Sequence, residues 1–555
     1  MNTIKARLDL LYPGKADAVF AAITALVEKW KAVPVKKYPS LSEKDVALIT
    51  YGDSLHNDKK GEALKTLNRF LTERLHGCVN IVHILPMFPY TSDDGFSVSD
   101  YRTVNKNLGE WSDIDALSKN FDLVLDAVIN HCSVSSAYFK GFLSGDEKYR
   151  DFFIDCDPNA DYTQVIRPRT HPLLTPFTTQ DGVVRHVWTT FSEDQVDFNY
   201  ANPAVLLEAL DILLLYTTRG ARFIRLDAIG FIWKKLGTSC MHLRETHEII
   251  KIMRSVLNAI SPNCALITET NVAHKDNIAY FGNGKDEASL VYQFPLPPLV
   301  LYSFIAGNAE KLTHWAANLD QCEKGTAYFN FLASHDGIGV RPVEGILNDR
   351  EKKLMVDTVI RRGGKISYRS LPGGIQEPYE LNISYIDALS DNDEDDAIRL
   401  KRFAAAHVLL LSLSGLPAIY YNSILGTRND LHGAETSGIN RRINRKKFSY
   451  TEIEKALNDG GSLPSKTFFT LKALIEKRVR CPHFAPDASQ KVLAIDPRVF
   501  VLKRKAEEEK GCVYALINVS GESCALTLPG GIRERLDPFE AKWLFRDLES
   551  APFDE

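Results

Sequence analysis

The stretch ARFIRLDAIGF, residues 221–231, decides the fold that we expect for this chain. It is a short apolar run that carries Arg225 and, two residues later, Asp227. Residues two apart on a strand point to the same face, so both side chains should project together at the strand's end. A carboxylate beside a permanent cation stays ionised near neutral pH, which suits a nucleophile. Taken alone, the stretch leaves a buried structural ion pair open as the alternative.

Short apolar runs that end in polar or aromatic residues recur along the whole chain. They cover residues 47–54, 79–89, 121–131, 221–231, 265–271, 288–294, 327–336 and 416–425. Helical patterns occupy residues 60–77 and 201–220, the second with Asn202 as cap and Pro203 as first helical residue. Eight buried strands with intervening helices predict an α/β fold. Their number favours a closed (β/α)8 TIM barrel over a doubly wound sheet.

Polar residues follow the predicted strands at the point where each one ends. In a (β/α)8 barrel these ends form the catalytic face. We therefore expect the following side chains to share one rim: His83, Asp126, Asn130, His131, Arg225, Asp227, Glu269, His335 and Asp336.

Two intervals do not fit a plain barrel. Residues 133–200 are rich in aromatics, prolines and arginines without a clear helical pattern, and residues 337–395 hold a charged helical piece followed by the loop RSLPGGIQEPYELN. Loops this long inside a compact domain are usually functional, so we interpret both as insertions beside the cleft. From about Arg480 the pattern becomes short and alternating, which predicts a small antiparallel β-domain. The expected segments are 1–132 (N-terminal extension and start of the barrel), 133–200 (insertion), 201–336 (barrel), 337–395 (second insertion, an acceptor or phosphate loop), 396–479 (end of the barrel) and 480–555 (C-terminal β-domain).

The composition is that of a soluble globular protein. Of 555 residues, 45% are apolar and 25% charged, and 67 Lys+Arg against 71 Asp+Glu leave a net charge of −4. This balance gives no reason to expect a nucleic-acid partner, and no stretch has the form of a membrane span. The nine cysteines lack metal-ligand spacing, and the N-terminus lacks a signal-peptide pattern. We expect a cytoplasmic protein, monomeric or homodimeric, with reduced thiols.

Three acidic residues at three strand ends match the needs of glycosidic bond chemistry. Asp227 is the candidate nucleophile and Glu269, in LITETN, the candidate acid/base. Asp336, in ASHDG, is the candidate for holding sugar hydroxyls and favouring ring distortion. A retaining glycosidase needs one carboxylate that attacks the anomeric carbon and one that protonates the leaving oxygen.

The motifs DAVINH (126–131), FIRLDAIGF (223–231), ITETN (267–271) and ASHDG (333–337) resemble the four signature regions of the α-amylase superfamily, in the same order. SDDGFSVSDY, GTSC, HDGIGV and INRKKFS are similar to the sucrose phosphorylase branch of that superfamily. The resemblance implies a reversible transfer of a glucosyl group between an acceptor and inorganic phosphate. It implies phosphate as co-substrate and no cofactor. Some α-amylase relatives bind calcium near the asparagine that corresponds to Asn130, but nothing near it in the sequence provides a convincing cage of oxygen ligands, so we expect no metal.

The resemblance also implies roles for individual residues. It assigns contacts with glucose or the shape of its pocket to Asp94, His131, Phe191, Gln195, Arg225, His335 and Arg445. It assigns phosphate to Arg169, and a guanidinium fork is a natural partner for a phosphate dianion. Arg167 could share this task or merely solvate its loop.

The chain departs from sucrose phosphorylases on the acceptor side. Phe231 stands where they commonly have tyrosine, Tyr379 and Glu380 replace a tyrosine–glutamine pair, and about forty residues precede the first predicted strand. These features favour an anionic acceptor, with Arg341 as one cation that could pair with it. We expect 2-O-α-D-glucosylglycerate as substrate. Sucrose 6′-phosphate, sucrose, an α-glucosidase or transglucosylase activity, and a catalytically inactive binding protein stay open as alternatives.

Overall fold

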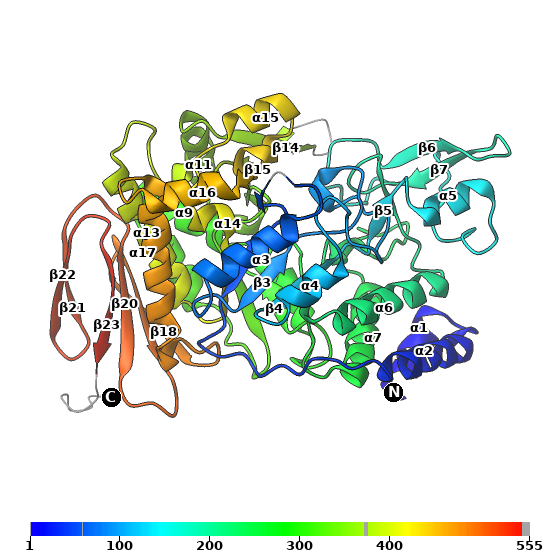
Figure 1. Ribbon diagram of the computed structural model, residues 1–555, viewed down its shortest axis with the longest axis horizontal. Helices are drawn as coiled ribbons and strands as arrows, with labels where there is room; N and C mark the ends of the chain where they lie inside the picture. The colour runs from blue at the N-terminus through cyan, green and yellow to red at the C-terminus, as the bar shows by residue number, and fades with distance from the viewer. Residues whose placement is uncertain (1, 58, 371–375, 547–555) are drawn as a thin grey trace.

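The computed structural model describes residues 2–57, 59–370 and 376–546. At its centre, eight parallel strands close into a barrel in chain order (Figure 1). They are β1 (Ala47–Thr50), β3 (Ile81–Ile84), β4 (Asp122–Ala127), β9 (Ala221–Leu226), β10 (Ala265–Thr268), β11 (Leu290–Tyr292), β12 (Ala327–Phe331) and β16 (Leu416–Tyr420). Each predicted apolar run contains one of these strands, so the predicted TIM barrel is confirmed. The strands are buried on both faces, as parallel strands under a layer of helices are.

Helices connect the strands and cover the outside of the barrel. They include α3 (Ala63–Arg74), α4 (Trp111–Leu117), α6 (Pro203–Thr218), α7 (Arg244–Ile260), α8 (His274–Ile278), α9 (Leu296–Ala306), α10 (Glu310–Ala317), α13 (Asp396–Ser412), α16 (Tyr450–Asn458) and α17 (Leu463–Arg478). The predicted start of α6 is confirmed, because the Asn202 side chain accepts a hydrogen bond from the Ala204 N–H at 3.0 Å.

The first insertion follows β4. It contains β5 (His131–Ser133), α5 (Ala137–Ser144), β6 (Leu174–Thr178), β7 (Val184–Trp188) and β8 (Gln195–Asp197). The expectation of no helix here was wrong. Ser136 caps α5 by accepting from the Phe139 N–H at 3.1 Å, and the rings of Phe139 and Phe142 pack against Phe153. The helix is only 8 residues long, too short to display a clear apolar periodicity.

The second insertion follows β12. It contains β13 (Ile338–Gly339), α11 (Asp349–Arg361), β14 (Lys365–Ser370) and β15 (Gln376–Asn382). The charged helical piece is confirmed as α11. The predicted loop is instead two paired antiparallel strands, with Lys365 opposite Asn382 and Ser370 opposite Gln376. The glycine-rich part of that loop, residues 371–375, lies outside the described residues.

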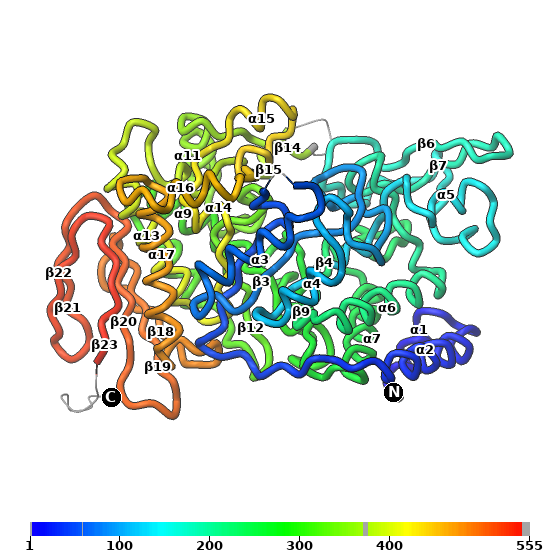
Figure 2. Tube along the Cα trace, viewed as in Figure 1, coloured from blue at the N-terminus to red at the C-terminus, as the bar shows by residue number. Residues whose placement is uncertain are grey.

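The two ends of the chain add to the barrel on different sides. At the N-terminus, α1 (Asn2–Leu11) packs on α7, and α2 (Ala16–Lys31) packs on α6 and α7. At the C-terminus, β18 (Ser489–Asp496), β19 (Val499–Lys505), β20 (Cys512–Asn518) and β23 (Ala541–Arg546) form an antiparallel sheet, beside the pair β21 (Cys524–Leu528) and β22 (Ile532–Leu536). Figure 2 shows these additions at opposite ends of the molecule, with both insertions along its upper edge. The predicted C-terminal β-sheet is confirmed, while the six segment boundaries stay predictions.

Most of the apolar core is one cluster that joins the barrel strands, the covering helices and one side of the C-terminal sheet. Among the described residues, none of the helices is both long enough and apolar enough to span a bilayer.

Candidate active site

Strand register places Asp227 and Glu269 side by side. Leu226, the last residue of β9, pairs with Thr268, the last residue of β10, and the two acids follow immediately. The Glu269 Oε2 atom accepts a hydrogen bond from the Ala228 N–H at 3.0 Å. Ala228 has φ +49°, a left-handed conformation that non-glycine residues adopt at a cost and that is found mainly at functional sites. The turn after β9 thus holds both carboxyl groups in one place.

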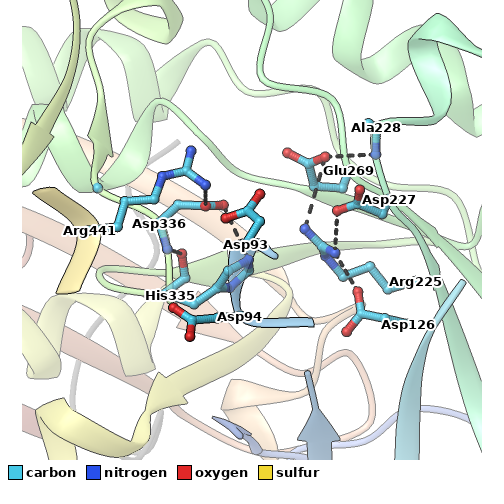
Figure 3. Close-up of polar contacts among 12 residues, drawn as sticks. Asp93, Asp94, Asp126, Arg225, Asp227, Ala228, Glu269, His335, Asp336 and Arg441 are labelled. Atoms are coloured by element: carbon cyan, nitrogen blue, oxygen red, sulfur yellow. Dashed lines mark hydrogen bonds and ion pairs between the residues drawn. The ribbon is translucent and has the colours of Figure 1, made fainter. Parts of the chain in front are cut away.

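Arg225 is the buried cation that the two acids share. Its guanidinium donates a hydrogen bond to Asp126 on β4 and lies 2.8 Å from Asp227 Oδ1 and 3.9 Å from Glu269 Oε2 (Figure 3). Arg225 and Asp126 are almost completely buried, whereas Asp227 faces a cavity. The ion pair considered from the sequence, Arg225–Asp227, is therefore present, and Arg225 is paired with the buried Asp126 as well. The Asp227 carboxylate extends this pairing to the cavity surface.

Burial raises the pKa of both neighbouring acids. For Glu269, burial and the negative charges of Asp227 and Asp336 raise the pKa to about 7, although Arg225 opposes this. Burial also raises the pKa of Asp227, against the lowering effect of Arg225 that the sequence led us to expect. Arg225 lies closer to Asp227 than to Glu269, so its positive charge stabilises the Asp227 carboxylate more. When the pair holds one proton, that proton is therefore on Glu269. One ionised and one protonated carboxyl is the division of labour that a retaining glycosidase needs.

Asp336 lies across the site and is held as an anion. Burial alone would raise its pKa, but the positive charges of Arg441 and Arg445 lower it well below the usual range. Arg441 Nη1 is 2.7 Å from Asp336 Oδ1, and the same guanidinium donates to both Glu380 oxygens at 3.1 and 3.0 Å. Arg441 was not among the residues predicted from the sequence. Its only signal was the arginine-rich run NRRINRKKF, of which the family motif singles out Arg445.

These acids surround a cavity with an empty volume of about 880 Å³, which includes the part that is open to solvent. The sequence-predicted residues that line it are His131, Arg169, Phe191, Gln195, Asp227, Glu269, His335, Asp336, Tyr379 and Glu380. Asp94, Arg225, Phe231 and Arg445 do not contribute to its wall. Asp93, Asn271 and Asn444 line it without having been predicted.

Asp94 and Arg445 bind each other beneath the cavity. Arg445 Nη1 lies 2.7 Å from Asp94 Oδ2, and Arg442 Nη2 lies 2.7 Å from the other Asp94 oxygen. The Arg445 Nε also donates to the His335 carbonyl at 2.6 Å. The His335 ring stacks on Phe96 with centroids 4.7 Å apart, and burial lowers its pKa well below the ordinary value, so the ring is neutral.

The first insertion supplies one wall. The His131 Nε2 atom lies 2.9 Å from the Phe96 carbonyl and 3.2 Å from the Gln195 amide nitrogen, so both predicted side chains meet at one point. The Phe191 ring lies 5.2 Å from the His131 ring and 5.5 Å from the Phe231 ring, centroid to centroid. Phe231 itself lines a smaller cavity that adjoins the first.

Arg169 lies on the rim between the two insertions. Its guanidinium lies over the Tyr379 ring, 5.8 Å from the centroid. In the described part of the chain no carboxylate lies within 4.0 Å of it. Arg167, two residues away, has its Nη2 atom buried without a hydrogen-bond partner among the described residues and does not line the cavity.

The residues around Asn130 show whether a metal cation could bind there. Its Oδ1 atom accepts from Lys234 at 2.9 Å, and the same ammonium lies 2.6 Å from Asp197. The lysine thus supplies positive charge beside these oxygens. Within the described residues, no group of three or more His, Cys, Asp or Glu side chains is arranged to hold a metal ion.

Comparison with known proteins identifies the family of this fold and site. The model of the α-amylase catalytic domain matches residues 77–360. The chain belongs to the α-amylase family. Within that family it is 45% identical over 556 residues to the glucosylglycerate phosphorylase of Allomeiothermus silvanus, covering 98% of both chains. It is 45% identical over 516 residues to the glucosylglycerate phosphorylase of Escherichia coli, covering 92% of both.

Among solved structures, this α-amylase family chain resembles sucrose 6F-phosphate phosphorylase from Thermoanaerobacter thermosaccharolyticum. The TM-score is 0.75 at 27% identity, over 89% of this chain and 98% of that one. The predicted relationship to the sucrose phosphorylase branch is confirmed. The roles of individual site residues stay predictions.

Proposed function

We propose that the chain is a retaining phosphorylase that converts 2-O-α-D-glucosylglycerate and inorganic phosphate into α-D-glucose 1-phosphate and glycerate. The observation that carries this proposal is the 45% identity to glucosylglycerate phosphorylases over the full length of both chains. The similarity to the sucrose 6F-phosphate enzyme is lower, at 27%. The arrangement of the three carboxyl groups supports the retaining mechanism.

In the first half of the reaction the Asp227 carboxylate attacks the anomeric carbon. The bond from that carbon to the glycerate oxygen breaks, and the Glu269 proton moves to the departing oxygen. Its pKa of about 7 leaves a large fraction of Glu269 protonated near neutral pH. Asp336, an anion beside Arg441, accepts hydrogen bonds from sugar hydroxyls as the ring flattens toward an oxocarbenium-like state. The product is a covalent β-glucosyl ester of Asp227, and glycerate leaves.

In the second half, a phosphate oxygen attacks the same carbon from the face that glycerate vacated. The ester bond to Asp227 breaks, and the carboxylate is restored. The proton of monohydrogen phosphate either stays on the phosphate or moves to Glu269, which is ionised at this stage. Two inversions return the α-configuration, so the product is α-D-glucose 1-phosphate.

Arg169 is proposed to bind the phosphate. It lines the cavity and has no carboxylate within 4.0 Å in the described residues, so its charge is available to an anion. A hydrolase needs no such group, because its second nucleophile is neutral water. This cation favours phosphorolysis over the α-glucosidase or transglucosylase alternative.

The remaining parts of the proposal concern the context of the reaction. Phosphate is the co-substrate, and no cofactor takes part. We propose a cytoplasmic enzyme, monomeric or homodimeric, with small molecules as its partners. An inactive binding protein is the less suitable interpretation, because Asp227, Glu269 and Asp336 all line the cavity.

The test is a substrate panel with and without phosphate. It contains 2-O-α-D-glucosylglycerate, sucrose, sucrose 6′-phosphate and 2-O-α-D-glucosylglycerol, and α-glucose 1-phosphate is measured enzymatically. We expect phosphate-dependent product from glucosylglycerate at the highest kcat/KM. Higher activity on sucrose or sucrose 6′-phosphate would show that glycerate is not the natural acceptor. Glucose release that does not depend on phosphate would show that the enzyme is a hydrolase and not a phosphorylase.

A further inference from the structure

A second cavity opens directly beside the acid/base Glu269. Its empty volume is about 390 Å³, and it shares Phe191, Ala228, Glu269, Asn271 and Tyr379 with the main cavity. Glucose is expected in the main cavity, next to Asp227. The group that leaves with the Glu269 proton must lie on the other side of Glu269. The smaller cavity is therefore in the right place for the acceptor.

Arg341 brings positive charge to this smaller cavity. The side chain is half-buried and lines the wall, at the start of the second insertion. In the described part of the chain, no carboxylate lies within 4.0 Å of it and its guanidinium makes no hydrogen bond. Arg225, Arg441 and Arg445, by contrast, are each paired with an aspartate. An uncompensated guanidinium on the wall of a small cavity provides a strong site for an anion.

Asn271 adds an unused hydrogen-bond acceptor. Its Oδ1 atom is buried and has no partner among the described residues, and the side chain lines both cavities. Buried amide oxygens are usually hydrogen-bonded, so this unpaired oxygen beside the cavity is able to accept from a ligand hydroxyl. Phe231 and Met241, which pack with Val272, supply apolar surface. The cavity thus offers one cation and one acceptor on an otherwise largely apolar wall.

We propose that this smaller cavity binds the glycerate unit, with Arg341 holding its carboxylate and Asn271 Oδ1 accepting from its primary hydroxyl. In 2-O-α-D-glucosylglycerate the carboxylate and the hydroxymethyl group that carries the primary hydroxyl are both attached to the carbon that bears the glycosidic oxygen. When Glu269 protonates that oxygen, both groups lie beside Glu269, within reach of this wall. Arg341 then selects an anionic acceptor over a neutral one. This inference rests on the proposed function.

Arg341 and Arg169 have different tasks under this proposal. Arg169 lines the main cavity and serves phosphate, whereas Arg341 lines the smaller cavity and serves the acceptor. Substitution of Arg341 should therefore change acceptor selectivity and leave phosphate use nearly unchanged.

The experiment measures glucosyl transfer from α-glucose 1-phosphate to glycerate and to glycerol. Glycerol replaces the carboxylate by a hydroxymethyl group and keeps the carbon skeleton. We expect the wild type to prefer glycerate, and Arg341→Gln to lower the ratio of the two kcat/KM values by about 10- to 100-fold. Transfer to glycerol and the kcat/KM for phosphate in phosphorolysis should change by less than about threefold, since neither glycerol nor phosphate carries the carboxylate that Arg341 holds. Arg341→Lys should retain part of the preference, because it keeps the charge and loses the fork.

Arg350→Gln is the matched control, because Arg350 is exposed on α11, near Arg341 in the chain and outside both cavities. Retained transfer to glycerol confirms that the variant is folded. An unchanged ratio in Arg341→Gln, or equal losses for glycerate and phosphate, would overturn the inference and leave the proposed function standing. A wild type that forms no glucosylglycerate would overturn both.

Discussion

Arg441 Nη1 lies 2.7 Å from Asp336 Oδ1, and through this contact the second insertion is tied to the catalytic face of the barrel. The same guanidinium is paired with Glu380 on β15, whose carboxylate also accepts from the Gly337 N–H at 2.9 Å. Asp336 follows β12, so a barrel strand and an insertion strand meet on one cation. One side chain therefore helps to hold the hairpin and, together with Arg445, keeps Asp336 ionised.

Replacing Arg441 should impair both catalysis and folding stability. Arg441→Met removes the main positive charge beside Asp336 and leaves Glu380 unpaired, and we expect kcat/KM to fall at least roughly tenfold, that is by about 1.4 kcal/mol or more in barrier. Arg441→Lys should recover part of the loss, because it restores the charge next to Asp336. Steady-state kinetics with Tm measurements check this. Equal activity of the Met, Lys and wild-type enzymes would contradict a role for this cation.

The proton on Glu269 should set the alkaline limit of phosphorolysis. Its pKa of about 7 means that the acid form is lost as the pH rises through that value, and the rate should decline with it. α-D-Glucosyl fluoride is the control substrate, because fluoride departs without a proton. The decline in rate at alkaline pH should be absent when the fluoride is the substrate. Glu269→Gln should still process the fluoride, while its rate on glucosylglycerate should fall by roughly 10²- to 10⁴-fold. The same alkaline decline with both substrates would point to another titrating group.

The same raised pKa predicts an effect on stability. The folded protein binds the Glu269 proton more tightly than the unfolded chain, whose carboxyl has the ordinary value of 4.5. Its contribution is complete below that value and is lost as the pH rises toward about 7. Glu269→Gln cannot ionise, so its Tm should exceed that of the wild type by more at alkaline than at acidic pH. Thermal unfolding across this range tests the sign, and a constant difference would contradict it.

Phosphate use should depend on Arg169. Arg169→Ala should raise the KM for phosphate and weaken phosphorolysis more than the residual hydrolysis of the same substrate, since water needs no cation. Arg185→Ala is the control, because Arg185 is an exposed arginine of the same insertion, paired with Asp155 outside the cavity. Proportional losses of phosphorolysis and hydrolysis would remove the phosphate role.

Asp227 should be indispensable for every glucosyl transfer. Asp227→Ala leaves no carboxylate to form the covalent ester, so phosphorolysis, hydrolysis and transfer to glycerate should all be abolished. Asp349→Ala, an exposed position on α11, should behave as the wild type. Normal turnover of the Asp227 variant would sink the nucleophile assignment.

The barrel could be predicted from the sequence because each of its strands is a short apolar run with a polar end. The predicted rim then followed from topology, since parallel strands in a barrel place their ends together. The insertions resisted prediction for a different reason. The helix α5 is held by an aromatic cluster, and the strands β14 and β15 by each other, so their stability comes from tertiary contacts that no local period reveals.

The residues of the site also fall into those that the sequence predicts and those that it does not. Asp227, Glu269 and Asp336 were predictable because they stand in motifs at strand ends. Arg441 was not, since nothing in the run NRRINRKKF distinguishes it from its neighbours until the hairpin places Glu380 opposite it. The pKa of Asp227 likewise depends on how deeply the turn after β9 is buried, a property of the packed site and not of the pair Arg225–Asp227.

The most direct test of the account is the anomeric configuration of the sugar phosphate, followed by proton NMR while the enzyme acts on 2-O-α-D-glucosylglycerate in phosphate buffer. Double displacement through Asp227 predicts that the sugar phosphate is formed as α-D-glucose 1-phosphate and that glycerate appears in equal amount. A β-configured product would contradict the retaining mechanism, and free glucose formed at the same rate without phosphate would contradict phosphorolysis itself.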